Sequence, residues 1–285
     1  MAFPRLIRVD IDRFLSRHGE SAVNLIAAYS GANEPACLRR ALELFPNDPQ
    51  VLWPAINAPF LEGERAALIE RFKTSDPNNP LPFLYSALDL AQQKNPDATL
   101  AELRTGLQKP GLYMWFSEQV AARELLFQEA GYSVLDAQSH AFLGQPLPQL
   151  GTAQKIGKWI EEQQEAASAS GDAAGAVELS GLAYSLGQMF ATPEAARTLM
   201  GQLVGLSLET RALKSLPGDA APTWLGQDAA SRLAQIQQRR AEIKALMPSA
   251  ETLWEQANPE RLAEYYRRNK AEGEEPALRW LKENP

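Results

Sequence analysis

The sequence predicts an all-α protein: stacked antiparallel helical hairpins in the first half and a less regular helical bundle in the second. Three observations predict this fold class. Alanine, leucine, glutamate, glutamine and arginine dominate, and runs of the β-branched residues that favour strands are nearly absent. Apolar residues recur at helical spacing. Prolines, often beside asparagine or aspartate, repeatedly stand where one helix would end and the next begin.

Composition excludes several classes of protein. The chain has 285 residues, of which 45% are hydrophobic and 22% charged, as in ordinary soluble globular proteins. Its net charge of -7 disfavours nucleic-acid binding, which usually needs a basic surplus. Cys37 is the only cysteine, so neither an intrachain disulfide nor a cysteine zinc site is expected. No apolar run is long enough for a signal peptide or a membrane span.

The clearest helix boundary lies in residues 41–49. An amphipathic helix is expected to run to Phe45, and Pro46 ends it because proline cannot continue a helix. Asp48 offers a side-chain acceptor to the free amides of the next helix, and Pro49 suits the first turn of that helix. The same order of residues returns at Pro77, which lies 31 residues after Pro46. A weaker instance at Pro110 follows after a further 33 residues, and such a period is typical of tetratricopeptide-type arrays.

The residues at these boundaries resemble a known family. The segments 41–48 and 77–80 resemble the end of a tetratricopeptide repeat, and Gly171-Asp172, followed by Ala176 and Ala183, is similar to the tight turn inside one. Prolines at 54 and 59 depart from the pattern of the family's first helix, and the resemblance covers about the first 115 residues. It implies a divergent tetratricopeptide-like α-solenoid with a concave groove.

Longer helices are expected after residue 112. They are predicted at residues 112–130, 133–142, 151–169, 173–190, 194–215, 227–247 and 249–257, with two more beginning near 258 and 275. Ser133 is expected to cap the second of these, Thr192-Pro193-Glu194 to begin the fifth, and Pro248 to end the sixth. The prolines in 144–148 suggest a boundary between a repeat region at 1–145 and a helical continuation at 146–285, with 227–285 as C-terminal capping helices. One continuous domain is the alternative.

Two glycines mark one of these helices. Gly201 and Gly205 lie four residues apart among leucines. Because glycine costs a helix about 1 kcal/mol relative to alanine, close packing of a neighbouring helix is the expected reason for the pair. We expect this helix to be the central buried one of the second half.

The sequence predicts no catalytic residue, no metal site and no cofactor. His18 and His140 lack partners at metal-ligand spacing, and Cys37 is expected to be a small buried apolar residue. Glycine loops for phosphate, nucleophile elbows and calcium loops are absent from the sequence. Adjacent carboxylates such as Glu161 and Glu162 point in different directions on a helix. Carboxylates converging from separate helices remain open, so an α-helical enzyme acting on carbohydrate or lipid is one alternative function.

Two basic clusters do not indicate nucleic-acid binding. Tyr265-Tyr266-Arg267-Arg268 is surrounded by glutamates, and Arg239-Arg240 is followed by Glu242. We expect one buried tyrosine and an ion pair between Glu264 and Arg268.

The predicted function is protein–protein interaction or scaffolding, with a peptide or protein in the concave groove. Most of the six tryptophans are expected in the core, but Trp53 is expected to face the groove. The predicted partner-binding residues are Gln50, Trp53 and Asn57 from one unit and Leu84, Leu88 and Gln92 from the next. A structural homo-oligomer, with the groove filled by a second copy, is a further alternative.

The resemblance also suggests a bacterial protein. Similar chains often carry a membrane anchor ahead of such a helical region, which implies that this chain is the soluble portion of an extracytoplasmic protein. A cytoplasmic protein is the alternative.

Overall fold

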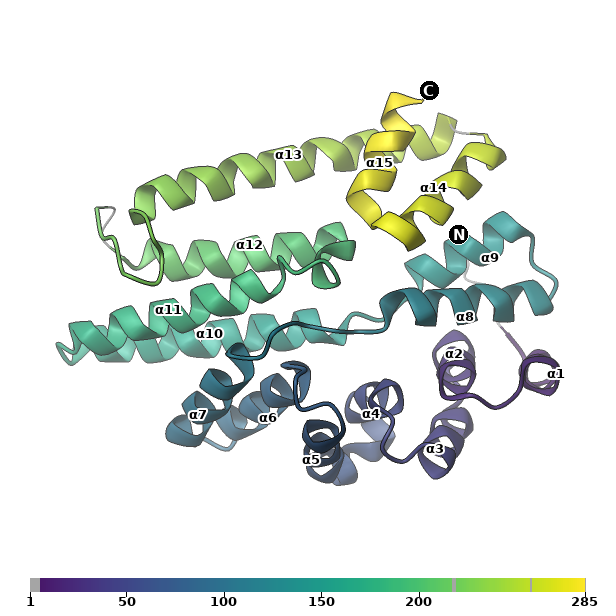
Figure 1. Ribbon diagram of the computed structural model, residues 1–285, viewed down its shortest axis with the longest axis horizontal. Coiled ribbons are helices and arrows are strands. Elements are labelled where there is room, and N and C mark those ends of the chain that lie inside the picture. Colours follow the sequence, from purple (N-terminus) through teal and green to yellow (C-terminus); the bar gives the residue numbers. More distant parts are fainter. Residues whose placement is uncertain (1–5, 217–218, 257, 285) are drawn as a thin grey trace. The chain divides into compact units, whose positions relative to one another are not determined.

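A computed structural model describes residues 6–216, 219–256 and 258–284, without the side chains of 248–256. Every regular element in these ranges is a helix, which confirms the predicted all-α class (Figure 1). The α-helices are α1 (Arg8–His18), α2 (Ala22–Ala32), α3 (Pro35–Leu44), α4 (Pro49–Ile56), α5 (Arg65–Ser75), α6 (Leu81–Gln92), α7 (Pro96–Leu107), α8 (Phe116–Glu129), α9 (Val134–Leu143), α10 (Pro148–Ala169), α11 (Ala173–Met189), α12 (Leu199–Lys214), α13 (Ala229–Gln256), α14 (Pro259–Glu272) and α15 (Glu274–Glu283). Two 3₁₀ helices are η1 (Pro59–Glu64) and η2 (Ala195–Arg197).

The chain forms two compact units, each discontinuous in sequence. Unit 1 comprises Met1–Pro77, Met114–Leu147 and Thr252–Pro285, and unit 2 comprises Asn78–Tyr113 and Pro148–Glu251. The boundary predicted near residue 145 lies close to the passage from unit 1 to unit 2 at Leu147. The predicted C-terminal range 227–285 is divided between the units.

Unit 1 is organised around α8, which packs against α1, α2, α9 and α14. Phe14, Phe116, Leu126 and Phe127 are buried in one apolar cluster there. The α14–α15 pair packs on α8 and α9 through α14. The hydroxyl of a tyrosine on α14, Tyr266, lies 3.2 Å from that of Ser139 on α9.

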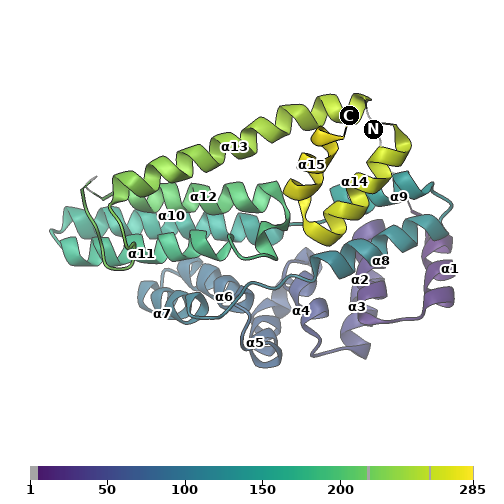
Figure 2. The ribbon, with the colours of Figure 1, turned by 45° about the horizontal axis from the view of Figure 1, so that its top comes forward.

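Unit 2 is organised around α10, α11 and α12, which lie side by side in Figures 1 and 2 and contact one another. α6 packs against α7 and α10, and α7 also contacts α11. At the α11–α12 crossing, a Cβ added to Gly205 would lie 2.9 Å from the carbonyl oxygen of Gly187 and 2.8 Å from Cβ of Phe190. The predicted close packing at Gly205 is therefore confirmed.

The other predicted glycine has a different role. A Cβ added to Gly201 would meet the carbonyl oxygen of Ala195 at 2.3 Å, in the 3₁₀ helix η2 that precedes α12. Because Gly201 has no side chain, α12 can begin close to the Ala195 carbonyl group. The sequence did not single out Gly187, which stands opposite Gly205.

Four predicted helix starts are correct, and at two of them, Asp48 and Ser133, the cap itself was predicted. The Asp48 side chain accepts a hydrogen bond from the backbone N–H of Gln50 (2.8 Å), with Pro49 in the first turn of α4. Ser133, Asp172 and Asn258 are the N-caps of α9, α11 and α14, and each side chain accepts a backbone N–H three residues further on.

Three predicted boundaries are wrong. The helix expected at 112–130 begins only at Phe116, because Trp115 has a left-handed backbone (φ 51°) and the amide of Asn79 donates to the carbonyl oxygen of Tyr113 (2.9 Å). The helix expected from Pro193 begins at Leu199, after η2 and with Thr198 as its cap. Pro248 does not end a helix, since the backbone of α13 continues to Gln256.

Candidate functional site

The candidate site is a cavity of about 520 Å³ in unit 2. It is open to solvent, and three segments line it: the end of α7 with the residues that follow it, the second half of α11, and the loop after α12. Its lining residues are Leu107, Lys109, Pro110, Gly111, Tyr184, Ser185, Gln188, Met189, Thr192 and Trp224. This volume falls within the range of small-molecule pockets.

Two aromatic side chains form one wall. The rings of Tyr184 and Trp224 lie 5.3 Å apart between centroids, with 39° between their planes. Trp224 packs over Gly181, where a Cβ would lie 3.1 Å from the indole Nε1. That buried Nε1–H has no hydrogen-bond partner among the described residues. Gly181 therefore gives the indole its space on α11.

Among the described residues that line the cavity, Lys109 carries the one cationic group, an ammonium. The backbone N–H of Lys109 donates to the carbonyl oxygen of Gly106 (3.0 Å) at the end of α7. Its Nζ lies 4.8 Å from the ring centroid of Phe83 on α6. Phe83 is held by close packing, since a Cβ added to Gly106 would lie 2.8 Å from Cβ of Phe83. The α6–α7 packing thus fixes the ring below the ammonium.

An ion pair with a buried carboxylate lies next to the aromatic wall. Arg232 of α13 donates from Nη2 to Oε2 of Glu209 on α12 (2.6 Å), and its guanidinium lies 5.8 Å from the ring centroid of Tyr184. Burial raises the pKa of Glu209, although Arg232 and the cavity residue Gln188 lower it. The pair joins α12 and α13 where Tyr184 borders the cavity.

Two of the usual general acid–base groups, the carboxylate and the imidazole, are missing from the described lining of the cavity. None of its ten lining residues carries a carboxylate or an imidazole. Glu209 is only 2% exposed and does not line it. The converging carboxylates of the enzymatic alternative do not occur among the described residues that line this cavity.

A second cavity of about 340 Å³ lies in unit 1, beside the end of α5. Asn47, Glu70, Arg71, Thr74 and Ser75 line it. Lys73 donates to Glu70 (2.8 Å), so this carboxylate is already paired. The smaller cavity has no aromatic wall.

The six predicted groove residues are divided between the units. Gln50, Trp53 and Asn57 belong to unit 1, whereas Leu84, Leu88 and Gln92 belong to unit 2. Trp53 is only 4% exposed, and its ring lies 6.4 Å from that of Trp115. Leu84 and Leu88 are also buried, while Gln50 and Asn57 are half-buried and Gln92 is exposed. The groove stays a prediction, but its aromatic residue is a core residue in the structure.

The two histidines contact a carboxylate and aromatic rings of the protein, and the cysteine is buried. His18 lies 3.1 Å from the carboxylate of Glu129, and the ring of His140 packs against the rings of Phe127 and Tyr132. Cys37 is buried as predicted, and burial raises the pKa of its thiol to about 11. Within the described ranges, no group of three or more histidine, cysteine or acidic side chains is placed to hold a metal ion.

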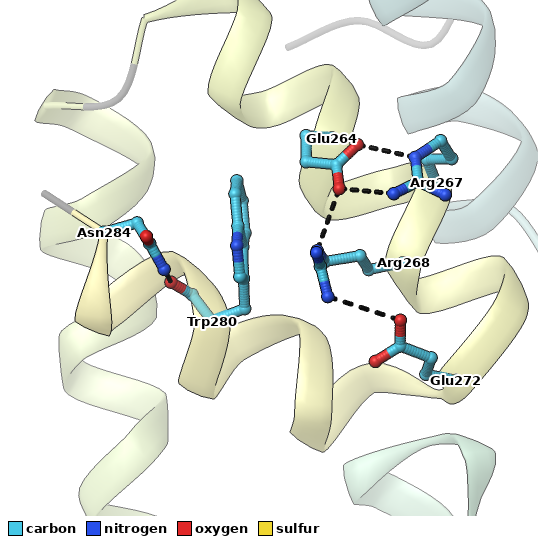
Figure 3. Close-up of polar contacts among 6 residues, drawn as sticks. All are labelled: Glu264, Arg267, Arg268, Glu272, Trp280 and Asn284. Carbon is cyan, nitrogen blue, oxygen red and sulfur yellow. Dashed lines mark hydrogen bonds and ion pairs between the residues drawn. The ribbon is translucent and has the colours of Figure 1, made fainter.

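The C-terminal arginines form ion pairs within unit 1 (Figure 3). Glu264 accepts hydrogen bonds from Arg267 and Arg268, which confirms the predicted Glu264–Arg268 pair (2.9 Å). Arg268 also contacts Glu272 (3.4 Å), and its guanidinium lies 4.9 Å from the ring centroid of Trp280 on α15. Acidic partners thus neutralise both arginines.

The tyrosines of the first basic cluster and Arg239 of the second can also be compared with the expectations. Both Tyr265 and Tyr266 are buried, although one buried tyrosine was predicted. The guanidinium of Arg239 contacts Glu242 (3.4 Å) and donates to Gln202 (2.9 Å). This cluster too has acidic and polar neighbours on the protein itself.

Comparison of the chain with protein-family models, with curated proteins and with solved structures finds no match. Among the helices that the structure describes, none is long and apolar enough to cross a membrane.

Proposed function

We propose that this protein is a non-catalytic binding module that holds a segment of a partner protein in the cavity of unit 2. The observation that carries the proposal is the lining of that cavity. It combines an aromatic wall with polar side chains and contains neither a carboxylate nor a histidine. Tyrosine and tryptophan are enriched at protein interfaces, because they supply a large contact area with few rotatable bonds.

We further propose that the helices form a divergent tetratricopeptide-like array. What supports this is that helices consecutive in sequence pack on each other, as in the pairs α2–α3, α4–α5, α6–α7 and α10–α11. Helical hairpins that cannot bury an apolar face alone are stabilised by stacking on their neighbours. Such arrays use their extended concave surfaces for binding, which is consistent with a scaffolding role.

The test blocks the cavity without disturbing the core. Ser185 lines the cavity from an exposed position on α11, so Ser185→Phe fills the space at little cost to folding. Val177 is an exposed residue of the same helix outside the cavity, and Val177→Phe is the matched control. Hexapeptide mixtures would be selected on immobilised wild-type protein and their affinities measured by fluorescence anisotropy.

The expected result is a set of peptides that bind the wild-type protein and Val177→Phe equally. Ser185→Phe should bind the same peptides at least about tenfold more weakly, because the new ring occupies their site. Failure to enrich any peptide, or equal binding to all three proteins, would contradict the proposal. Light scattering on the same samples checks whether a second copy of the chain occupies the cavity.

A further inference from the structure

We infer that the cavity of unit 2 selects a segment carrying a carboxylate beside an aromatic or aliphatic side chain. This inference rests on the proposed function and adds to it the chemical class of the ligand. Two features of the lining carry it: the ammonium of Lys109 and the Tyr184–Trp224 wall.

Lys109 differs from three arginines of unit 2 that form ion pairs. Arg104 on α7 pairs with Glu178 (2.6 Å), Arg197 with Glu194 (2.7 Å), and Arg232 with Glu209 (2.6 Å). Within the described part of the chain, Lys109 forms no ion pair, and its ammonium lies over the Phe83 ring. An aromatic face attracts a cation, but it offers no oxygen or nitrogen atom to accept a hydrogen bond from it. The three ammonium donors therefore remain available to an incoming anion.

The position of Lys109 is defined by the fold. Pro110 follows it, and proline restricts the preceding backbone to extended conformations. Phe83 below the ammonium is fixed by its close packing on Gly106. Because the side chain is half-buried, an ion pair formed there would be screened less than one on the open surface.

The aromatic wall sets the second requirement. Tyr184, Trp224 and Met189 give the cavity an apolar surface next to its polar residues. A ligand with a carboxylate but no apolar group would leave this apolar surface exposed to water. A ligand with an apolar side chain but no carboxylate would leave the Lys109 ammonium without an anionic partner. The net charge of -7 does not oppose a local site, since screening at physiological ionic strength limits the field of distant charges to about 8 Å.

A carboxylate can come from an acidic side chain or from the end of a chain. Two hexapeptide mixtures distinguish these sources, one with free C-termini and one with amidated C-termini. If only the mixture with free C-termini yields binders, the cavity binds a C-terminal carboxylate. If both mixtures yield binders, it binds the carboxylate of an acidic side chain. In either case, replacing the carboxylate by an amide should weaken binding.

The test compares wild-type protein with Lys109→Gln and Lys109→Arg. For a selected acidic peptide, Lys109→Gln should weaken binding about fivefold to tenfold and reduce its salt dependence. Lys109→Arg should largely preserve binding. The amide form of the peptide should bind the wild-type protein and Lys109→Gln equally, because the interaction that the variant removes is already missing.

The two proposals fail in different ways. If peptides lose binding to Ser185→Phe but bind Lys109→Gln as tightly as wild-type protein, the carboxylate inference is wrong and the binding function stands. If no peptide depends on Ser185, both proposals are wrong. Neutral or basic peptides among the tightest binders would also overturn the carboxylate inference.

Discussion

The α11–α12 crossing allows a sharp test of the structure of unit 2. A Cβ added to Gly205 would approach the Gly187 carbonyl oxygen and the Phe190 Cβ, atoms that are part of the backbone or bonded directly to it. Neither can move unless the helices separate. Overpacking of this kind costs about 1–3 kcal/mol, and the rigid neighbours favour the upper end. Alanine offsets this cost by about 1 kcal/mol, because it favours helix over glycine. Gly205→Ala should therefore destabilise unit 2 by about 2 kcal/mol.

Gly151 provides the matched control in the same unit. It is exposed on α10, and a Cβ there would meet nothing within 4 Å. Gly151→Ala should stabilise unit 2 by up to about 1 kcal/mol, through helix propensity alone. Urea unfolding followed by far-ultraviolet circular dichroism measures both variants. The reasoning is refuted if Gly205→Ala is as stable as the wild-type protein, or if Gly151→Ala is the less stable of the two.

Three other predictions concern a helix cap, a buried carboxyl group and the thiol. Asn258→Ala removes the cap of α14 and should cost unit 1 about 1 kcal/mol in urea unfolding; an Asn258→Ser variant as unstable as the alanine would argue against a capping role. Because burial raises the pKa of Glu209, its contribution to stability should decline as pH rises through the ordinary carboxyl range toward the folded value. Glu209→Gln should remove this decline in urea midpoints measured across mildly acidic pH, and an unchanged pH profile would count against the assignment. Since the pKa of the buried Cys37 thiol is about 11, a chromogenic thiol reagent at neutral pH should react slowly with folded protein and rapidly in urea; fast reaction in both would show that Cys37 is accessible.

Local sequence signals predicted the fold class and many helix starts. Asp48, Ser133, Asp172 and Asn258 each act within three residues of their own position, so their capping role can be read without knowledge of the rest of the chain. The all-α class follows from composition and from the spacing of apolar residues, which are also local properties.

The wrong boundaries depend on contacts between distant segments. Residues 112–115 have helical composition, but the hydrogen bond from Asn79 to the Tyr113 carbonyl holds this segment outside α8. At Pro193 the sequence offered a good cap, yet Thr198 takes that role, because Gly201 lets α12 begin close to Ala195. Tertiary packing decided between competing local signals in each case.

The candidate site could not be predicted by the same means. Lys109, Ser185 and Trp224 come from separate segments, with no shared spacing or motif. Trp53 shows the opposite case, since the assumed repeat geometry placed it in a groove whereas the structure packs it against Trp115. Gly181 was a usable signal, because a glycine within a helix invites a close neighbour, and that neighbour is the Trp224 indole.

Hydrogen–deuterium exchange with and without a selected peptide tests the central claim most directly. Exchange reports protection segment by segment, so it locates the binding site without substitution. The proposed function predicts slower exchange in residues 107–111 and 184–192 and in the loop around Trp224, with no change in α4. Protection confined to α4 around Trp53, or to the cavity beside α5, would contradict the assignment of the binding site to unit 2.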